Sequence, residues 1–185
     1  MPIKVAQEAK FLDLIFDTKL TFKNHVQHLK SSCQKALDSL WVVGHTDWGA
    51  DHIVLLCLYL ALAHSKLDYG CTVYESACQL ALEQLDLIHH QGLCIMSGAF
   101  CASPAQSLYV EACKPSLASH CLKLALNYVL KPKSLPKNPT YSCIFESENI
   151  KLFQESEQTI PPLSINILFH LEKSKVSQSG LAVRC

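Results

Sequence analysis

Arginine is almost absent from this chain of 185 residues: Arg184 is the only one, whereas lysine occurs fifteen times. Arginine is the side chain best suited to phosphate, because its planar guanidinium donates two parallel hydrogen bonds. The chain also lacks net charge, since 16 basic residues balance 16 acidic ones. These absences exclude a general attraction to nucleic acid or to an anionic membrane, so any such binding must depend on a local group of lysines.

Two further absences narrow the class of protein. The ten cysteines include no CxxC pair, and residues 1–10 lack the apolar core of a signal peptide. We therefore expect reduced thiols and an intracellular location, in the cytoplasm or nucleus, rather than secretion. The longest apolar run, residues 53–63, is shorter than the roughly 20 residues that span a membrane. It predicts a central helix, apolar nearly all round, and no association with a membrane.

Length and composition predict one globular domain of ordinary size, because 49% of the residues are hydrophobic and only 17% are charged. We expect three regions along it. Residues 1–20 form a short β element, residues 21–131 form a helical bundle, and residues 132–185 form an extended, proline-containing tail without helical periodicity. The predicted fold is mainly α-helical, with about five helices.

Apolar residues recur at steps of three and four, which is typical of helices that bury one face. The predicted helices cover about residues 21–43, 50–65, 78–97, 104–113 and 117–130. In the first, the buried stripe should consist of Phe22, Val26, Leu29, Cys33, Leu37 and Leu40. Before it, residues 11–16 are rich in strand formers and predict one strand, alone or in a hairpin, followed by a turn at residues 17–19.

Local signals mark where two of these helices begin. Thr46 or Asp47 should cap the second helix. Ser103 should be the N-cap of the fourth, with Pro104 at its first helical position and Gln106 reaching back to the cap.

The third helix carries the most informative apolar seam, formed by Leu85, Ile88, Gly92, Ile95 and Ala99. Glycine in a helix costs about 1 kcal/mol relative to alanine. Its place on this seam therefore predicts the close approach of another helix at Gly92.

The arrangements that could support catalysis or metal binding are weak. The pair His25 and His28 lacks the spacing of a structural zinc site, as do Cys94, Cys101 and Cys113. A thiol nucleophile at Cys71 or Cys94 would need a positioned base; His89 and His90 lie near Cys94 in sequence, but such offsets share a helix face by default. No glycine-rich phosphate loop is present. We therefore predict no catalytic residue, no metal site and no cofactor.

Two readings of the bundle remain. Lys23, Lys30 and Lys35 lie along the first helix, where they are placed to contact phosphates, although a solvated lysine face is the commoner explanation of such a pattern. The alternative is a protein-interaction module without a role in nucleic-acid binding. Its exposed apolar seam at Leu85 and Ile88 would recruit a partner helix.

Several strings in the sequence resemble one family. They are FLDLIFDTKLTF, HTDWGAD, SKLDYGCTVY, and HHQGL followed by GAF and SLYVEA. In this order, over roughly residues 9–145, they resemble non-LTR retrotransposon reverse transcriptases of the Jockey-like group. The resemblance implies the region after the catalytic palm motifs: the end of the palm, a helical thumb, and the connection toward an RNase H domain.

In that family the segment matching Lys10, Phe11, Leu12 and Asp13 resembles the primer grip, in which glycine is usual where this chain has Asp13. A carboxylate there would repel a primer phosphate, and the close backbone approach that glycine permits would be lost. The family's catalytic aspartates would lie before Met1 and its RNase H carboxylates after Cys185. The resemblance thus implies a protein that is not an enzyme, binds template and primer weakly at most, and self-associates through exposed apolar surface.

The resemblance also offers a cause for the shortage of arginine. Cysteine and histidine are what single transitions in CGT or CGC arginine codons produce, so this pattern indicates a decayed retroelement. The positions where arginine is common in the family are His52, Cys57, His64, Cys78, Cys94, Cys101, His120 and Cys121.

Overall fold

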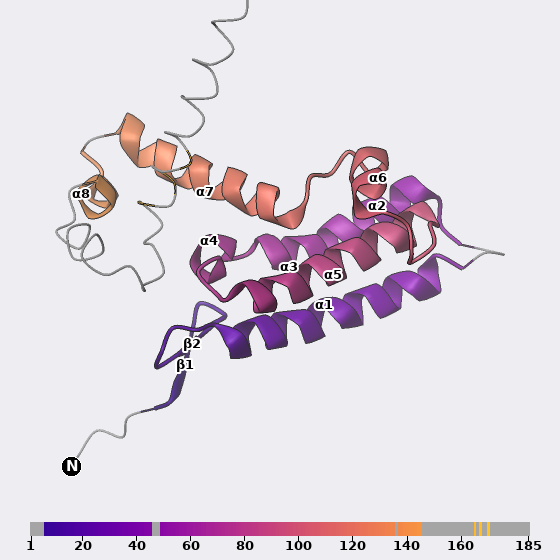
Figure 1. Cartoon of the computed structure of the whole chain (residues 1–185), viewed down its shortest axis with the longest axis horizontal. Helices are drawn as coiled ribbons and strands as arrows, with labels where there is room; N and C mark the ends of the chain where they lie inside the picture. Colours follow the sequence, from indigo (N-terminus) through magenta and orange to yellow (C-terminus); the bar gives the residue numbers. More distant parts are fainter. Residues whose placement is uncertain are drawn as a thin grey trace, which may run out of the picture. The chain divides into compact units, whose positions relative to one another are not determined.

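The computed structural model describes residues 6–45, 49–135, 137–145, 165, 167 and 170 (Figure 1). It confirms a mainly helical fold that begins with a short β element. The chain divides into two compact units, Met1–Cys121 and Leu122–Cys185, and each is described by itself.

The N-terminal β element is a hairpin of two antiparallel strands, β1 (Glu8–Phe11) and β2 (Leu14–Asp17). Of the two alternatives for residues 11–16, a lone strand or a strand in a hairpin, the hairpin is confirmed, although its turn falls inside that segment. Leu12 and Asp13 form a two-residue turn in which both φ angles are positive, at 46° and 65°. Turns of this kind match the twist of paired strands and favour residues such as Asp that tolerate the left-handed region. An apolar leucine within the turn hides that signal in the sequence.

The hairpin leads into α1 (Lys23–Val43), and Asp17 makes the connection. Its carboxylate accepts hydrogen bonds from the backbone N–H of Thr21 at 2.7 Å and from the Thr21 hydroxyl at 2.6 Å. The predicted apolar stripe of α1 is confirmed, because all six of its members are buried.

The second predicted helix is a continuous run of three elements, α2 (His52–Tyr59), the π-helix η1 (Leu60–His64) and α3 (Ser65–Asp68). It is not buried all round as predicted, because Ile53 and Leu62 are exposed. The N-cap position of α2 is Asp51. Thr46 and Asp47, the predicted caps, lie outside the described residues.

A short helix, α4 (Cys71–Tyr74), follows Gly70. Gly70 has a φ of 70°, and a Cβ atom on it would lie 2.8 Å from the side chain of Leu14 in β2. Both the conformation and the contact require glycine here. This glycine therefore lets the hairpin pack beside the end of α3.

The long helix α5 (Gln79–Ser97) is followed by α6 (Ala105–Glu111). The predicted cap of α6 was wrong: Pro104 occupies the N-cap position, and no side chain caps the helix. The carbonyl of Pro104 accepts the first hydrogen bond of the helix from Ser107, at 3.1 Å. Ser103 lies one residue too early, and its carbonyl accepts a hydrogen bond from His90 Nε2 at 3.0 Å instead.

The close approach predicted at Gly92 is confirmed, and the residue that approaches is Tyr59 of α2. A Cβ atom on Gly92 would lie 2.2 Å from Cε2 of the Tyr59 ring. The tyrosine is fully buried, and its hydroxyl lies 2.6 Å from Nδ1 of His89 in α5. On the other side of the imidazole, Nε2 lies 3.3 Å from the Pro115 carbonyl, which can only accept. His89 therefore donates from Nε2 and accepts the Tyr59 proton at Nδ1.

Burial and the neighbouring His64 lower the pKa of His89 to about 4, in agreement with a neutral ring. The seam residues Leu85 and Ile88 are also buried in the same unit. The exposed seam that the interaction-module alternative required at these two residues is therefore not present.

The second unit contains most of α7 (Leu117–Ser134) and α8 (Pro139–Phe145). Ala125 and Val129 of α7 form a small buried cluster with Ile167. Within residues 132–185, which were predicted as an extended tail without helical periodicity, the described part includes the end of α7 and all of α8. Helix α7 continues through Pro132, which removes one backbone donor near the end of the helix without terminating it. None of the helices in the described ranges has the length and apolarity needed to cross a bilayer.

The contact between Tyr59 and Gly92 predicts a specific coupling. Gly92→Ala should lower the free energy of unfolding by about 1–3 kcal/mol, because the new methyl group overlaps the tyrosine ring. In a Tyr59→Leu background the same change should be neutral or stabilising, since alanine favours the helix by about 1 kcal/mol. Urea denaturation of the four proteins measures the coupling. An equal cost of Gly92→Ala in both backgrounds would contradict the contact.

Candidate nucleic-acid interface

The residues predicted to resemble a primer grip lie at the tip of the hairpin. Lys10 and Phe11 end β1, Leu12 and Asp13 form the turn, and all four are exposed. Lys10 Nζ lies 2.6 Å from the Asp13 carboxylate. The hydrogen bond and charge of Lys10 hold the pKa of Asp13 below its usual range, so this carboxylate is ionised at neutral pH. Lys10, which was predicted to contact phosphate, is thus paired with Asp13, which was predicted to repel phosphate.

The three lysines of α1 do not form one group. Lys23 and Lys30 are seven residues apart and share a helix face, whereas Lys35 lies about 140° around the axis from Lys30. Lys30 is half-buried, and its Nζ donates to the Gln84 side chain of α5 at 3.2 Å. Lys23 and Lys35 are exposed.

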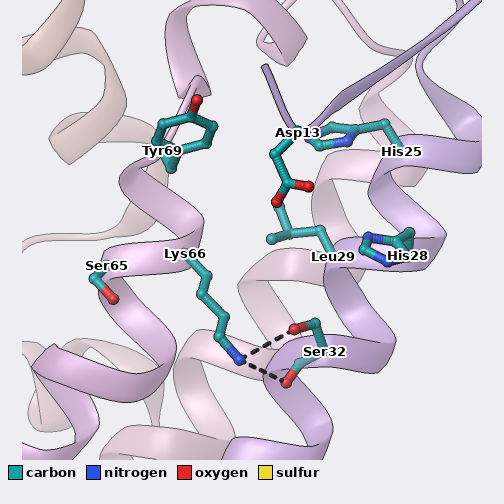
Figure 2. Close-up of a pocket in the computed structure, with 8 residues that line it drawn as sticks. All are labelled: Asp13, His25, His28, Leu29, Ser32, Ser65, Lys66 and Tyr69. Atoms are coloured by element: carbon teal, nitrogen blue, oxygen red, sulfur yellow. Dashed lines mark hydrogen bonds between the residues drawn. The ribbon is translucent and has the colours of Figure 1, made fainter. Parts of the chain in front are cut away.

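A pocket of 220 Å³, lined by several polar side chains, lies between the hairpin turn, α1 and α3 (Figure 2). We call it the hairpin pocket; its lining residues are Asp13, His25, His28, Leu29, Ser32, Ser65, Lys66 and Tyr69. Tyr69 joins its two sides, because its hydroxyl donates to the Leu12 carbonyl at 2.8 Å. This bond ties the turn of the hairpin to the end of α3.

Lys66 supplies the cation of the hairpin pocket. Its Nζ donates to the Ser32 carbonyl at 3.2 Å and to the Ser32 hydroxyl at 3.0 Å. An ammonium group has three donors, and these two bonds leave it the third. His28, which is exposed, adds a second nitrogen-bearing side chain from α1.

His25 contributes a buried donor. Its Nδ1 lies 3.4 Å from the backbone N–H of Ile15 and accepts from it. Burial, with a smaller effect of His28, lowers the pKa of His25, so the ring is neutral and its proton resides on Nε2. Among the described residues Nε2 has no hydrogen-bond partner. A buried donor left in this way destabilises the fold unless an acceptor oxygen reaches it.

The pocket combines groups that sequence reasoning found with others that it missed. Asp13 was predicted, and His25 and His28 were considered only as a poor zinc pair. Lys66 and Tyr69 were missed, although both lie within the string SKLDYGCTVY. Lys66 and Tyr69 are three residues apart, a spacing that places both on one side of a helical turn. In the structure this side faces the side of α1 that carries His25, His28 and Ser32. The three-residue spacing was the signal in the sequence that could have found them.

Of the two thiols considered as nucleophiles, Cys94 does not gain support as a reactive centre. Cys94 Sγ does lie 3.8 Å from His90 Nδ1. Burial, together with the neighbouring Cys101, raises the pKa of Cys94, which disfavours the thiolate that nucleophilic chemistry needs.

Comparisons of the chain with protein-family models, with curated proteins and with solved structures found no match.

The turn geometry predicts how the hairpin tolerates substitution. Asp13→Gly should keep the hairpin intact, because glycine adopts a φ of 65° without strain. Asp13→Val should open it, because a β-branched residue is strongly disfavoured there. Amide hydrogen exchange of β1 and β2 measures the difference. Ala9→Val is the matched control, since an extended strand position favours valine; equal protection in Asp13→Val and Ala9→Val would contradict the turn assignment.

Proposed function

We propose that the hairpin and the helices behind it act as a thumb-like unit of a reverse transcriptase-like element, which binds the nucleic-acid backbone weakly at the hairpin pocket. The observation that supports the proposal is that His25, whose Nε2 is buried and has no partner among the described residues, lines a pocket beside the turn that resembles a primer grip. A phosphate group fits this environment, because its oxygens only accept hydrogen bonds.

The donors of the pocket come from two elements. Lys66 offers its remaining ammonium proton from α3, and His25 and His28 belong to α1. Hydrogen bonds from a charged donor to phosphate are about twice as strong as neutral ones. Lys66 should therefore contribute most of the binding free energy. His25 should contribute by giving its buried Nε2 donor an acceptor.

The same geometry explains why the binding is weak. The Asp13 carboxylate lies in the pocket lining and repels a phosphate, while it also neutralises Lys10. Few cations remain to displace counterions, so the affinity should fall steeply as salt is added.

Binding of a fluorescently labelled primer–template duplex, followed by anisotropy at low salt, tests the proposal. Asp13→Gly should tighten binding by about three- to tenfold, because it removes the repulsive charge and frees Lys10. Lys66→Gln should weaken binding by a similar factor. Lys35→Gln removes the same charge from a residue of α1 that does not line the hairpin pocket, and it is the matched control. No change with Asp13→Gly, or an equal loss with Lys35→Gln and Lys66→Gln, would contradict the proposal.

A second candidate function is self-association, and a different surface favours it. Trp41 at the end of α1 and Phe100 after α5 are 69% and 87% exposed, and both line a cavity of 540 Å³ whose lining includes Ile95 and Ala99. Exposed aromatic surface of this kind is typical of contact sites between proteins. Sedimentation velocity over a range of concentrations should show oligomers of the natural chain that Phe100→Ser reduces. Leu80→Ser, at an exposed apolar residue of α5, is the control. An equal effect of the two substitutions would indicate non-specific hydrophobic association and would contradict a defined interface.

A further inference from the structure

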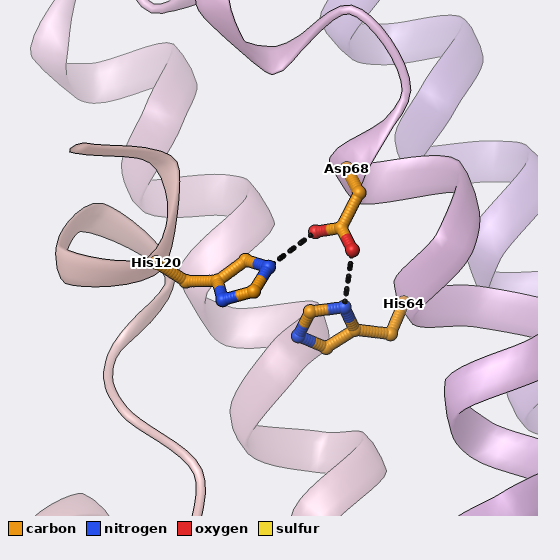
Figure 3. A group of neighbouring side chains, drawn as sticks. All are labelled: His64, Asp68 and His120. Carbon is orange, nitrogen blue, oxygen red and sulfur yellow. Dashed lines mark hydrogen bonds and ion pairs between the residues drawn. The ribbon is translucent and has the colours of Figure 1, made fainter. Parts of the chain in front are cut away.

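A second polar cluster lies away from the hairpin pocket, where His64, Asp68 and His120 converge (Figure 3). His64 ends η1, Asp68 ends α3, and His120 lies in the first turn of α7, all within the first compact unit. One Asp68 oxygen lies 3.2 Å from His64 Nδ1, and the other lies 3.0 Å from His120 Nε2. One donor atom from each residue can be chosen so that all three lie within 4.8 Å of one another.

The contact between Asp68 and His120 is short but is not a satisfied hydrogen bond. Asp68 Oδ1 and His120 Nε2 are both buried, and neither forms a hydrogen bond with any group among the described residues. They contact each other at 3.0 Å, and among the described residues neither atom has a further partner that would satisfy its remaining hydrogen-bonding capacity. A positive ion between them would satisfy the lone pairs of both.

We propose that His64, Asp68 and His120 bind one divalent transition-metal ion of the Zn²⁺ type. Two imidazole nitrogens and one carboxylate oxygen are a donor set that Zn²⁺ accepts, with bonds of about 2.0–2.2 Å. In a tetrahedral site with such bonds the donors lie about 3.3 Å apart. The contacts of 3.2 Å and 3.0 Å use the two different oxygens of Asp68, and one donor atom from each residue lies within 4.8 Å of the others. The side chains must therefore move closer together to hold one ion.

The neighbouring histidine is not a ligand. The ring of His89 lies 5.6 Å from that of His64. Both of its nitrogens are engaged, one with Tyr59 and the other with Pro115. His89 therefore forms a fixed wall on one side of the cluster and leaves a site of three protein donors.

The local fold explains why these side chains meet. His64 and Asp68 are four residues apart, so they lie on one face of the helical run. The wider turn of η1 buries His64, which is only 5% exposed, beside the fully buried Ala63. Single π-helical turns are found frequently at functional sites. Three protein donors leave the fourth position of a tetrahedral site for a water molecule.

A bound ion would join the start of α7 to the end of the η1–α3 run. It would thereby stabilise the folded chain, because an ion that binds only the folded state shifts the unfolding equilibrium. The role that we infer is structural. It is independent of nucleic-acid binding, because none of the three residues lines the hairpin pocket.

The test uses the purified full chain, stripped with a chelator and kept reduced, and titrated with Zn²⁺ by calorimetry. The natural chain should bind one equivalent, and Asp68→Asn and His120→Asn should each bind at least about tenfold more weakly. His52→Asn is the matched control, because His52 forms a similar contact with Asp51 at 3.1 Å on the surface. Zn²⁺ should raise the melting temperature of the natural chain and of His52→Asn, but not of the other two variants.

Cysteine binding must be separated from this site, and Co²⁺ does so. The Co²⁺ form should show visible bands of a four- or five-coordinate ion without the near-ultraviolet charge-transfer band of a thiolate ligand. A thiolate band, no binding, or equal binding by Asp68→Asn and His52→Asn would overturn the proposal. If the site variants fail to fold, the calorimetric stoichiometry and the Co²⁺ spectrum of the natural chain decide it. Absence of binding would leave only a histidine–carboxylate contact.

Discussion

The packing of Tyr59 on Gly92 positions much of the first unit. Because glycine leaves room for the ring, the α2–η1 run can pack closely against α5. The tyrosine hydroxyl then fixes His89, which in turn bonds the Pro115 carbonyl just before α7. Buried polar groups linked in this way are stable only when every member is satisfied. The η1–α3 run that carries His64, Lys66 and Asp68 is held in place by this contact, so both polar clusters depend on it.

Sequence reasoning succeeded where a single helix carries the signal. The buried stripe of α1 and the contact at Gly92 were predictable, because helical periodicity places such residues on one face. It failed where the signal is conformational or distant. The turn at Leu12 and Asp13 depends on positive φ angles, and the π-helix ending at His64 leaves no trace in residue types. The cluster that includes His120 joins residues far apart in the chain, which periodicity alone cannot reveal.

The hairpin pocket and the His64–Asp68–His120 cluster differ in the kind of ion that their polar groups favour. The hairpin pocket has an unpaired donor at His25 and a carboxylate at Asp13 that opposes an anion. The other cluster has a carboxylate oxygen and an imidazole nitrogen that face each other without a hydrogen bond. An anion suits the first environment and a cation the second.

The central claim is that the nucleic-acid backbone contacts this chain at the hairpin pocket. Amide chemical shifts recorded while a short primer–template duplex is added at low salt test it most directly, because they locate the contact residue by residue. The shifts should be concentrated at Asp13, Ser32, Lys66 and Tyr69 and should disappear as salt is added. Shifts confined to the face of α1 that carries Lys35, or no shifts at a large excess of duplex, would contradict it.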